Sequence, residues 1–231
     1  MDFLIDKNTQ TRIATLVDHA VQQVLRKIVN HGNEEGMTAA LGQALMQQRI
    51  NEANLKVDFN YRQHSKNTEE PHSGADGNFL VRVTTPSDNV VKASLFQAKL
   101  LRGYGEVRSL SMPKSEAGRL RQQSEDMLKH TGEAVAVFYT HKNIYVVDAE
   151  DYGNGPESTT PLSQGHRLIT LGTYLGRWMP RCTKGDKNSN LVKRASHLDG
   201  FKDGLTLDIV SKQPSVPWEQ DLAEDAWRKR R

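Results

Sequence analysis

Apolar residues near the start of the chain recur at helical spacing. From 13 to 28 they return every three or four positions, with polar residues between them, which predicts an amphipathic helix. A second apolar stripe runs from Met37 to Leu45, behind an expected N-cap at Asn33. Glu34 and Glu35 follow that cap, where negative charge meets the positive end of the helix dipole. We therefore expect two helices within the first fifty residues.

The pattern then changes to one that is typical of strands. Residues 55–61 alternate apolar and polar positions, as a half-buried strand does, and the apolar runs that follow are short and bounded by turn residues. The expected elements after the first strand are strands at 78–84 and 93–100, a helix at about 114–130, and strands at 134–139 and 144–147. We read the first three strands as a meander and the later helix as a crossover. This order indicates an α/β protein.

The last third of the chain gives weaker signals. A loop rich in Gly, Pro, Ser and Thr is expected at 153–165, a helix at 168–179 and a short strand at 205–210. We interpret residues 1–231 as a single domain, with a core at about 33–150 and a C-terminal α/β extension at about 151–231.

Composition narrows the class of protein. Hydrophobic residues make up 36% of the chain and charged residues 26%, which favours a polar domain that still buries a core. No apolar run approaches the length of a membrane span, and the N-terminus lacks the features of a secretory signal. The single cysteine, Cys182, excludes an internal disulfide framework and a multi-cysteine zinc site. A cytoplasmic protein is therefore expected.

The net charge of +3 is small but unevenly distributed. The segment 177–202 holds seven Lys or Arg residues against two Asp, and the chain ends in the basic run 228–231. Such segments suit a polyphosphate partner, although solvated surface charge explains each of them separately about as well.

Three polar side chains carry the candidate chemistry. Asp76 opens the strand expected at 78–84, whereas Gln97 and Lys99 lie inside the next strand. Gln97 and Lys99 are two residues apart, so they lie on the same side of that strand. A carboxylate and an amide oxygen can hold a hard divalent cation, and a lysine can bind a phosphate or orient a water. We expect the three groups to meet in one pocket.

Each of these residues also has a simpler interpretation. Asp76 lies in Ala-Asp-Gly, which is an ordinary turn sequence. Lys99 is a charged residue in an apolar strand, and lysine also occurs on edge strands, where it discourages aggregation. The combination of all three residues at this spacing favours the functional interpretation.

The combination resembles the PD-(D/E)XK nuclease superfamily, in the variant where Gln replaces the second acid. The resemblance covers about 34 to 148. It implies a restriction-endonuclease-like core, a mixed β-sheet flanked by helices, and a metal-dependent endonuclease (a hydrolase) that cleaves DNA in restriction, antiviral defence or repair. It implies catalytic roles for Asp76, Gln97, Lys99 and Glu35, with Mg²⁺, or Mn²⁺ as a substitute, held by Asp76, Gln97, the Ala98 carbonyl and Glu35. Either Glu34 or Glu35 suits the helix acid; we prefer Glu35, because Glu34 lies closer to the N-cap.

The resemblance also implies partners. The helix expected at 114–130 would flank the site, and polar residues on it would contact phosphate. These residues are Lys114, Arg119, Arg121, Gln122 and Gln123. The alternative is that they form a plain solvent-exposed face. DNA is the expected partner, RNA is an alternative, and a homodimer or a larger defence complex is compatible. The rival hypothesis is a catalytically inactive nuclease-fold module that binds nucleic acid or partner proteins.

Overall fold

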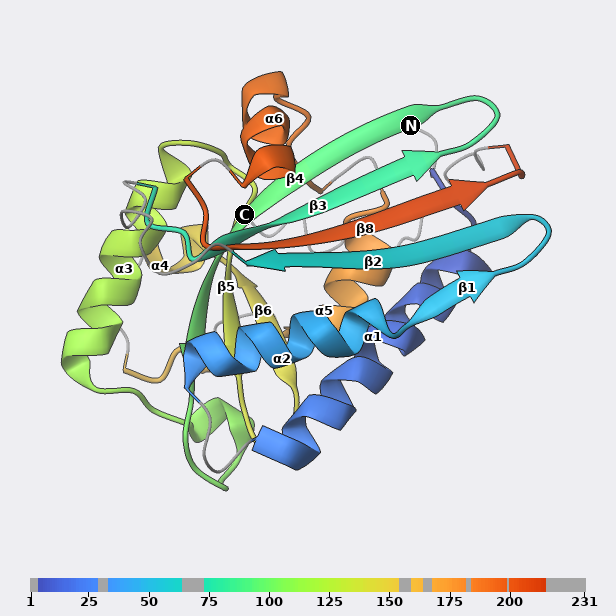
Figure 1. Cartoon of the computed structure of the whole chain (residues 1–231). Helices are drawn as coiled ribbons and strands as arrows, with labels where there is room; N and C mark the ends of the chain where they lie inside the picture. Colours follow the sequence, from blue (N-terminus) through green and yellow to red (C-terminus); the bar gives the residue numbers. More distant parts are fainter. Residues whose placement is uncertain are drawn as a thin grey trace.

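The computed structural model describes residues 4–28, 33–63, 73–153, 159–163, 168–181, 184–198 and 200–214. Within these ranges the chain forms a mixed eight-stranded sheet with helices on both faces (Figure 1). The predicted α/β class is therefore confirmed. Cys182 and the basic run 228–231 lie outside the described residues.

The helices and strands predicted between 13 and 147 are all present, in the predicted kind and order. The helices are α1 (Lys7–Ile28), α2 (Glu34–Met46), α3 (Lys114–Leu128), α4 (Glu150–Gly153), α5 (Leu171–Thr173) and α6 (Ser189–His197), with a 3-10 turn η1 (Val107–Ser109) and a π-helical turn η2 (Tyr174–Trp178). The strands are β1 (Arg49–Asn51), β2 (Leu55–Gln63), β3 (Gly77–Thr84), β4 (Asn89–Leu100), β5 (Ala134–Tyr139), β6 (Ile144–Asp148), β7 (Ile169–Thr170) and β8 (Asp203–Ser211). The prediction missed β1, α4 and α6, and the helix expected at 168–179 is instead β7, α5 and η2.

The strand order is β1-β2-β8-β3-β4-β5-β6-β7, so the last strand lies in the middle of the sheet. β8 pairs antiparallel with β2 and parallel with β3 along its length. The predicted meander is therefore wrong, because β8 separates β2 from β3, and of the three strands in the predicted meander only β3 and β4 pair with each other. The segment interpreted as a C-terminal extension supplies a central strand, not an addition to the sheet edge.

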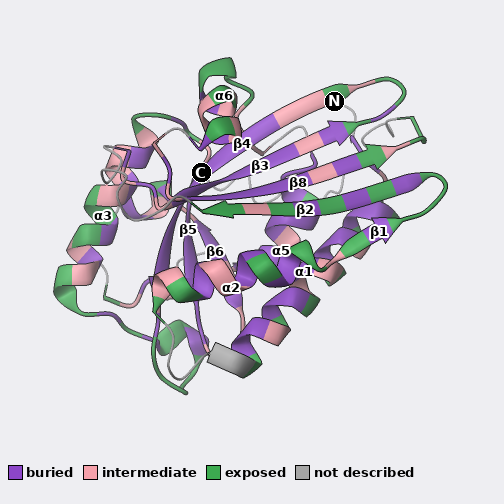
Figure 2. Cartoon of the chain, viewed as in Figure 1, coloured by how far each residue is buried: buried purple, intermediate pink, exposed green. Residues whose placement is uncertain are grey.

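Two layers of helices cover the sheet. α1, α2, α5 and η2 contribute to one large apolar cluster on one face, whereas α3 and α6 contribute to two smaller clusters on the other. Figure 2 shows that the central strands are mostly buried, while the outer sides of the helices are exposed. Within β4, Phe96 and Ala98 belong to the first cluster and Leu95 to the second. Because strand side chains alternate, Gln97 and Lys99 lie on the α3 side of the sheet.

The start of β3 leaves no space for a side chain at Gly77. A Cβ there would lie 2.4 Å from the Asp203 carbonyl oxygen on β8 and 2.6 Å from the Phe96 ring. We therefore expect Gly77→Ala to lower the free energy of unfolding, measured in urea, by about 1–3 kcal/mol. Gly132→Ala is the matched control, because a Cβ at Gly132 would meet nothing within 4 Å. Equal effects of the two substitutions would contradict this packing of β8 against β3.

Candidate functional site

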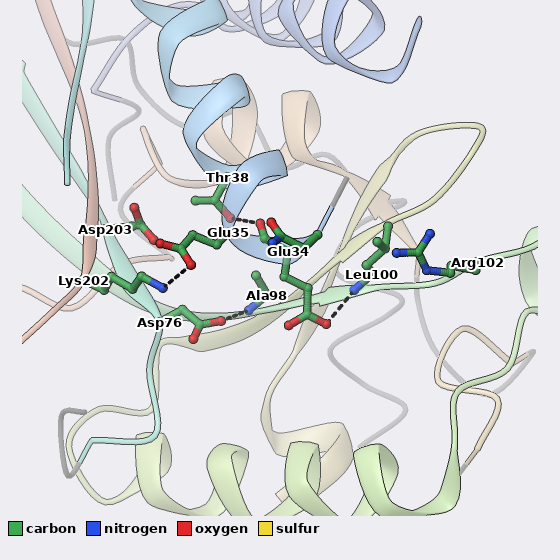
Figure 3. Close-up of a pocket in the computed structure, with 10 residues that line it drawn as sticks. Glu34, Glu35, Thr38, Asp76, Ala98, Leu100, Arg102, Lys202 and Asp203 are labelled. Atoms are coloured by element: carbon green, nitrogen blue, oxygen red, sulfur yellow. Dashed lines mark hydrogen bonds and ion pairs between the residues drawn. The ribbon is translucent and has the colours of Figure 1, made fainter. Parts of the chain in front are cut away.

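A pocket opens at the end of the sheet where β3 and β8 begin and β4 ends. Its volume is about 410 Å³, and its walls come from the first turns of α2, the end of β4, the start of β8 and the segments next to them. Four carboxyl groups and two cations are among its lining residues, which are Asn33, Glu34, Glu35, Thr38, Asp76, Ala98, Leu100, Arg102, Lys202 and Asp203 (Figure 3). The pocket wall therefore carries both negatively and positively charged side chains.

Asp76 connects the strands that form the pocket. Its Oδ2 accepts hydrogen bonds from the Ala98 N–H at 2.9 Å and from Gln97 Nε2 at 2.6 Å. Its backbone carbonyl accepts from the N–H groups of Lys202 and Asp203, at 3.2 and 3.1 Å. The carboxyl group is thus held against β4, while the backbone is held against β8.

The environment of Asp76 changes its acidity. Burial raises the pKa of Asp76 to about 6, and the neighbouring charges of Glu34 and Asp203 add to the rise. The hydrogen bond from the Ala98 N–H and the positive charge of Lys99 oppose it. A carboxyl group with a pKa near neutrality, next to a polar cavity, is typical of a functional site.

The amide of Gln97 lies between two oxygen atoms. Its Nε2 donates to Asp76 Oδ2 at 2.6 Å and to the Ala98 carbonyl at 3.2 Å. Its Oε1 is buried and has no hydrogen-bond partner among the described residues. A buried polar atom without a partner costs free energy, so this arrangement calls for an explanation.

Lys99 is a buried lysine, with 4% of its surface exposed. Its Nζ lies 3.7 Å from Glu116 Oε2 on α3 and 4.0 Å from Glu34 Oε2 on α2. These carboxylates satisfy the expectation that a charge at this position needs a partner. The lysine is therefore part of an ion-pair cluster between the two helices, not an exposed edge-strand lysine.

Gln97 and Lys99 share a face, as predicted, but neither is among the residues that line the pocket. The expectation that Asp76, Gln97 and Lys99 all enter one pocket is therefore wrong in part. The alternation of β4 explains the difference, because Ala98 and Leu100 line the pocket from the α2 side while Gln97 and Lys99 point the other way. Gln97 still meets Asp76, since β3 has not yet begun at that position.

The two candidate helix acids have different partners. Glu34 Oε1 accepts from the Leu100 N–H at 3.1 Å, so Glu34 reaches β4 beside Lys99. Glu35 Oε2 lies 3.2 Å from Lys202 Nζ, next to β8. The cap itself is made by Asn33, which accepts from the Gly36 N–H. Glu34 does lie next to the N-cap, as expected, but its carboxylate bonds to β4, so its place beside the cap is no reason to prefer Glu35.

The structure adds three residues that the sequence did not reveal. Asp203 lines the pocket, and its Oδ1 accepts a hydrogen bond of 2.5 Å from the Tyr61 hydroxyl; burial raises the pKa of Asp203. Lys202 lines the pocket beside it, and Glu116 reaches Lys99 from α3. No motif marks these residues, since Lys202 and Asp203 lie in a segment with weak signals and Glu116 lies in an ordinary helical turn.

The residues predicted to contact nucleic acid on α3 do not line the pocket. Arg119 pairs with Glu116 at 3.3 Å, Arg121 pairs with Glu125 at 3.0 Å, and Gln122 donates to Asp126 at 3.3 Å. Lys114 is exposed, and Gln123 is partly buried with no partner for its Oε1 in the described part of the chain. Pairs at this spacing are ordinary on a solvent-exposed helix, so contact with nucleic acid stays a prediction.

A metal ion would need ligands beyond acidic side chains. In the described ranges, no group of three or more His, Cys, Asp or Glu residues is placed to hold a metal. The expected ligand set of Asp76, Gln97, Ala98 and Glu35 has two carboxylates, and its other ligands are an amide oxygen and a backbone oxygen. Such oxygens are accepted ligands for hard cations.

No family model, curated protein or solved structure matches the chain. None of the helices in the described residues combines the length and apolar character that crossing a membrane requires.

Proposed function

We propose that this chain is a Mg²⁺-dependent endonuclease of the PD-(D/E)XK type, with Mn²⁺ as a substitute, which hydrolyses phosphodiester bonds in DNA. RNA is the alternative substrate. A cytoplasmic role in restriction, antiviral defence or repair, with a homodimer or a partner complex, belongs to the same proposal.

The contact of Gln97 with Asp76 and Ala98 supports it most directly. The polarised NH₂ group lies 2.6 Å from Asp76 Oδ2 and 3.2 Å from the Ala98 carbonyl oxygen, so positive charge is favourable between these two acceptors. Turning the amide by 180° would point Oε1 at both oxygens and would move the NH₂ group to the position that Oε1 now occupies. Three oxygens would then converge, which is unfavourable unless a cation lies among them. The residues present thus fit a divalent ion.

The surrounding residues suit hydrolysis of a phosphodiester. A bound Mg²⁺ would stabilise charge on the phosphate and lower the pKa of a bound water. With a pKa of about 6, Asp76 is mostly ionised above pH 7, and the charge of Lys99 helps to keep it so. Glu34 lines the pocket and is held by the Leu100 N–H and Lys99, and in this proposal it would orient a water.

A second candidate is the inactive module that binds nucleic acid or a partner protein. The orientation of the Gln97 amide favours it, because Nε2 already satisfies both oxygens without an ion. The inactive module is also favoured because no group of three or more His, Cys, Asp or Glu residues in the described part of the chain is placed to hold a metal.

Incubation with supercoiled plasmid separates the two candidates. We expect nicking or linearisation with Mg²⁺ or Mn²⁺ and none with EDTA. Asp76→Ala is expected to slow it by about 10²-fold or more, because an ion-binding carboxylate is removed. Asp58→Ala is the matched control, since Asp58 is an exposed carboxylate on β2. Plasmid binding without cleavage under any of these metals would favour the inactive module.

A further inference from the structure

Two cations lie at opposite ends of the pocket. In Figure 3, Lys202 lies at one end and Arg102 at the other, with the carboxylates of Asp76 and Glu34 between them. The nuclease resemblance did not include either residue, and Lys202 comes from the segment that precedes the central strand β8.

The backbone of Lys202 is fixed relative to Asp76. The Lys202 N–H donates to the Asp76 carbonyl at 3.2 Å, and the preceding residue, Phe201, is 1% exposed. Gly200, with a φ of 77°, makes the turn into this segment, a conformation that glycine adopts without strain. The position of the lysine is therefore tied to the position of the candidate ion-binding carboxylate.

The side chain of Lys202 is only lightly held. Its ion pair with Glu35 spans 3.2 Å, and 37% of the lysine side chain is exposed. Exposed pairs of this kind contribute little stability, because solvent screens them. Exchange of Glu35 for a phosphate oxygen would therefore cost little, whereas Lys99 is buried between two acids and is not placed to make such an exchange.

Building on the nuclease function proposed above, we propose that Lys202 and Arg102 bind the phosphates on either side of the phosphate at Asp76. The pocket then takes three successive phosphates of one nucleic-acid strand. The central phosphate meets the acidic part of the wall, where a metal ion would offset the repulsion, and the flanking phosphates meet the two cations. The order of charges along the pocket wall supports this proposal, because the carboxylates of Asp76 and Glu34 lie between the cations Lys202 and Arg102.

Binding of a fluorescein-labelled single-stranded oligonucleotide, followed by anisotropy with Ca²⁺ and separately with EDTA, tests the proposal. We expect Lys202→Ala to weaken binding by about tenfold, since it removes one charge-assisted contact. The slope of log affinity against log salt should fall by about 1. Lys202→Arg should bind nearly as the parent does. In EDTA, where no ion is bound, Glu35→Gln should bind more tightly, because the lysine loses its competitor.

Lys129→Ala is the matched control, because Lys129 is an exposed lysine paired with Asp126 on α3, away from the pocket. Equal affinities for Lys202→Ala and Lys129→Ala would overturn the proposal, as would failure of the parent protein to bind. Cleavage by the parent with equal affinities of the two variants would reject the flanking site and leave the nuclease function standing. A clear loss of affinity in Lys202→Ala, together with no cleavage by the parent protein, would reject the nuclease function and leave the flanking phosphate site standing.

A tetranucleotide, which has three phosphodiester linkages, distinguishes a direct contact from a general change in charge. Replacing one terminal linkage with an uncharged methylphosphonate should weaken binding to the parent protein. If Lys202 contacts that phosphate, the same replacement should have little effect on binding to Lys202→Ala. The opposite terminal linkage should show this coupling with Arg102→Ala instead. If the effects of the side-chain substitution and the linkage replacement on the binding free energy simply add at both ends, the proposal is overturned.

Discussion

Replacing Lys99 with methionine is expected to slow metal-dependent DNA cleavage by about 10²–10³-fold at pH 7, the range seen when a stabilising group is removed from an active site. Methionine keeps most of the apolar volume of the lysine and removes its charge. Glu34 and Glu116 would lose their shared partner, and the opposing influence of Lys99 on the pKa of Asp76 would disappear. Initial rates of plasmid nicking at several pH values measure the effect.

The pH profile shows how Lys99 acts. Without its charge the pKa of Asp76 rises above about 6, so the rising limb of the activity profile should move to higher pH. If Lys99 also contacts phosphate or water, a loss should persist at the highest pH tested. Lys129→Met, at an exposed position, controls for the loss of a positive charge. A profile for Lys99→Met that matches this control would contradict a role in the site.

Asp76→Asn is expected to make the protein more stable above pH 7, while it removes activity. The folded protein holds the proton of Asp76 more tightly than the unfolded chain, because burial raises the pKa from 3.8 to about 6. Well below pH 3.8 the carboxyl group is protonated in both states, so no charge is buried on folding. As the pH rises from 4 through 6 the unfolded chain loses its proton first, so the free energy of unfolding falls.

Well above pH 6 the whole penalty is present, on the order of 3 kcal/mol for two pKa units. Asparagine carries no charge, and its side-chain oxygen can still accept from the Ala98 N–H. Urea unfolding of both proteins at pH 4 and pH 8 measures the difference, which should be small at pH 4 and large at pH 8. A difference that is equal at the two pH values would contradict the raised pKa.

Local sequence patterns predicted the elements well because they depend on neighbouring residues. The helical spacing of α1, the Asn33 cap of α2 and the alternation of β2 need no information from the rest of the chain. The pairing of strands is different, since it is decided by contacts between distant residues. Nothing within 55–84 indicates that β8 separates β2 from β3, and this arrangement was missed for that reason.

The candidate site shows the same limit. The motif placed Asp76 beside Gln97, which the structure bears out with a hydrogen bond of 2.6 Å. The period of a strand also put Gln97 and Lys99 on one face. The two-residue period could not reveal that Gln97 and Lys99 point away from the pocket, because that depends on where β3 starts and on which face of the sheet α2 packs. Lys202 and Asp203 reach the pocket only through the central position of β8.

The central place of β8 links the pocket to the order in which the polypeptide is made. β8 begins at Asp203, whereas Asp76 and the strands on either side of β8 are made much earlier. Until residues 203–211 leave the ribosome, β2 and β3 lack the strand that joins them, and the Lys202 wall of the pocket is missing. Pairing across such a sequence separation is slow, because a long loop must close before the contacts form. A nascent chain therefore lacks a complete pocket until residues 203–211 have been made and have paired with β2 and β3.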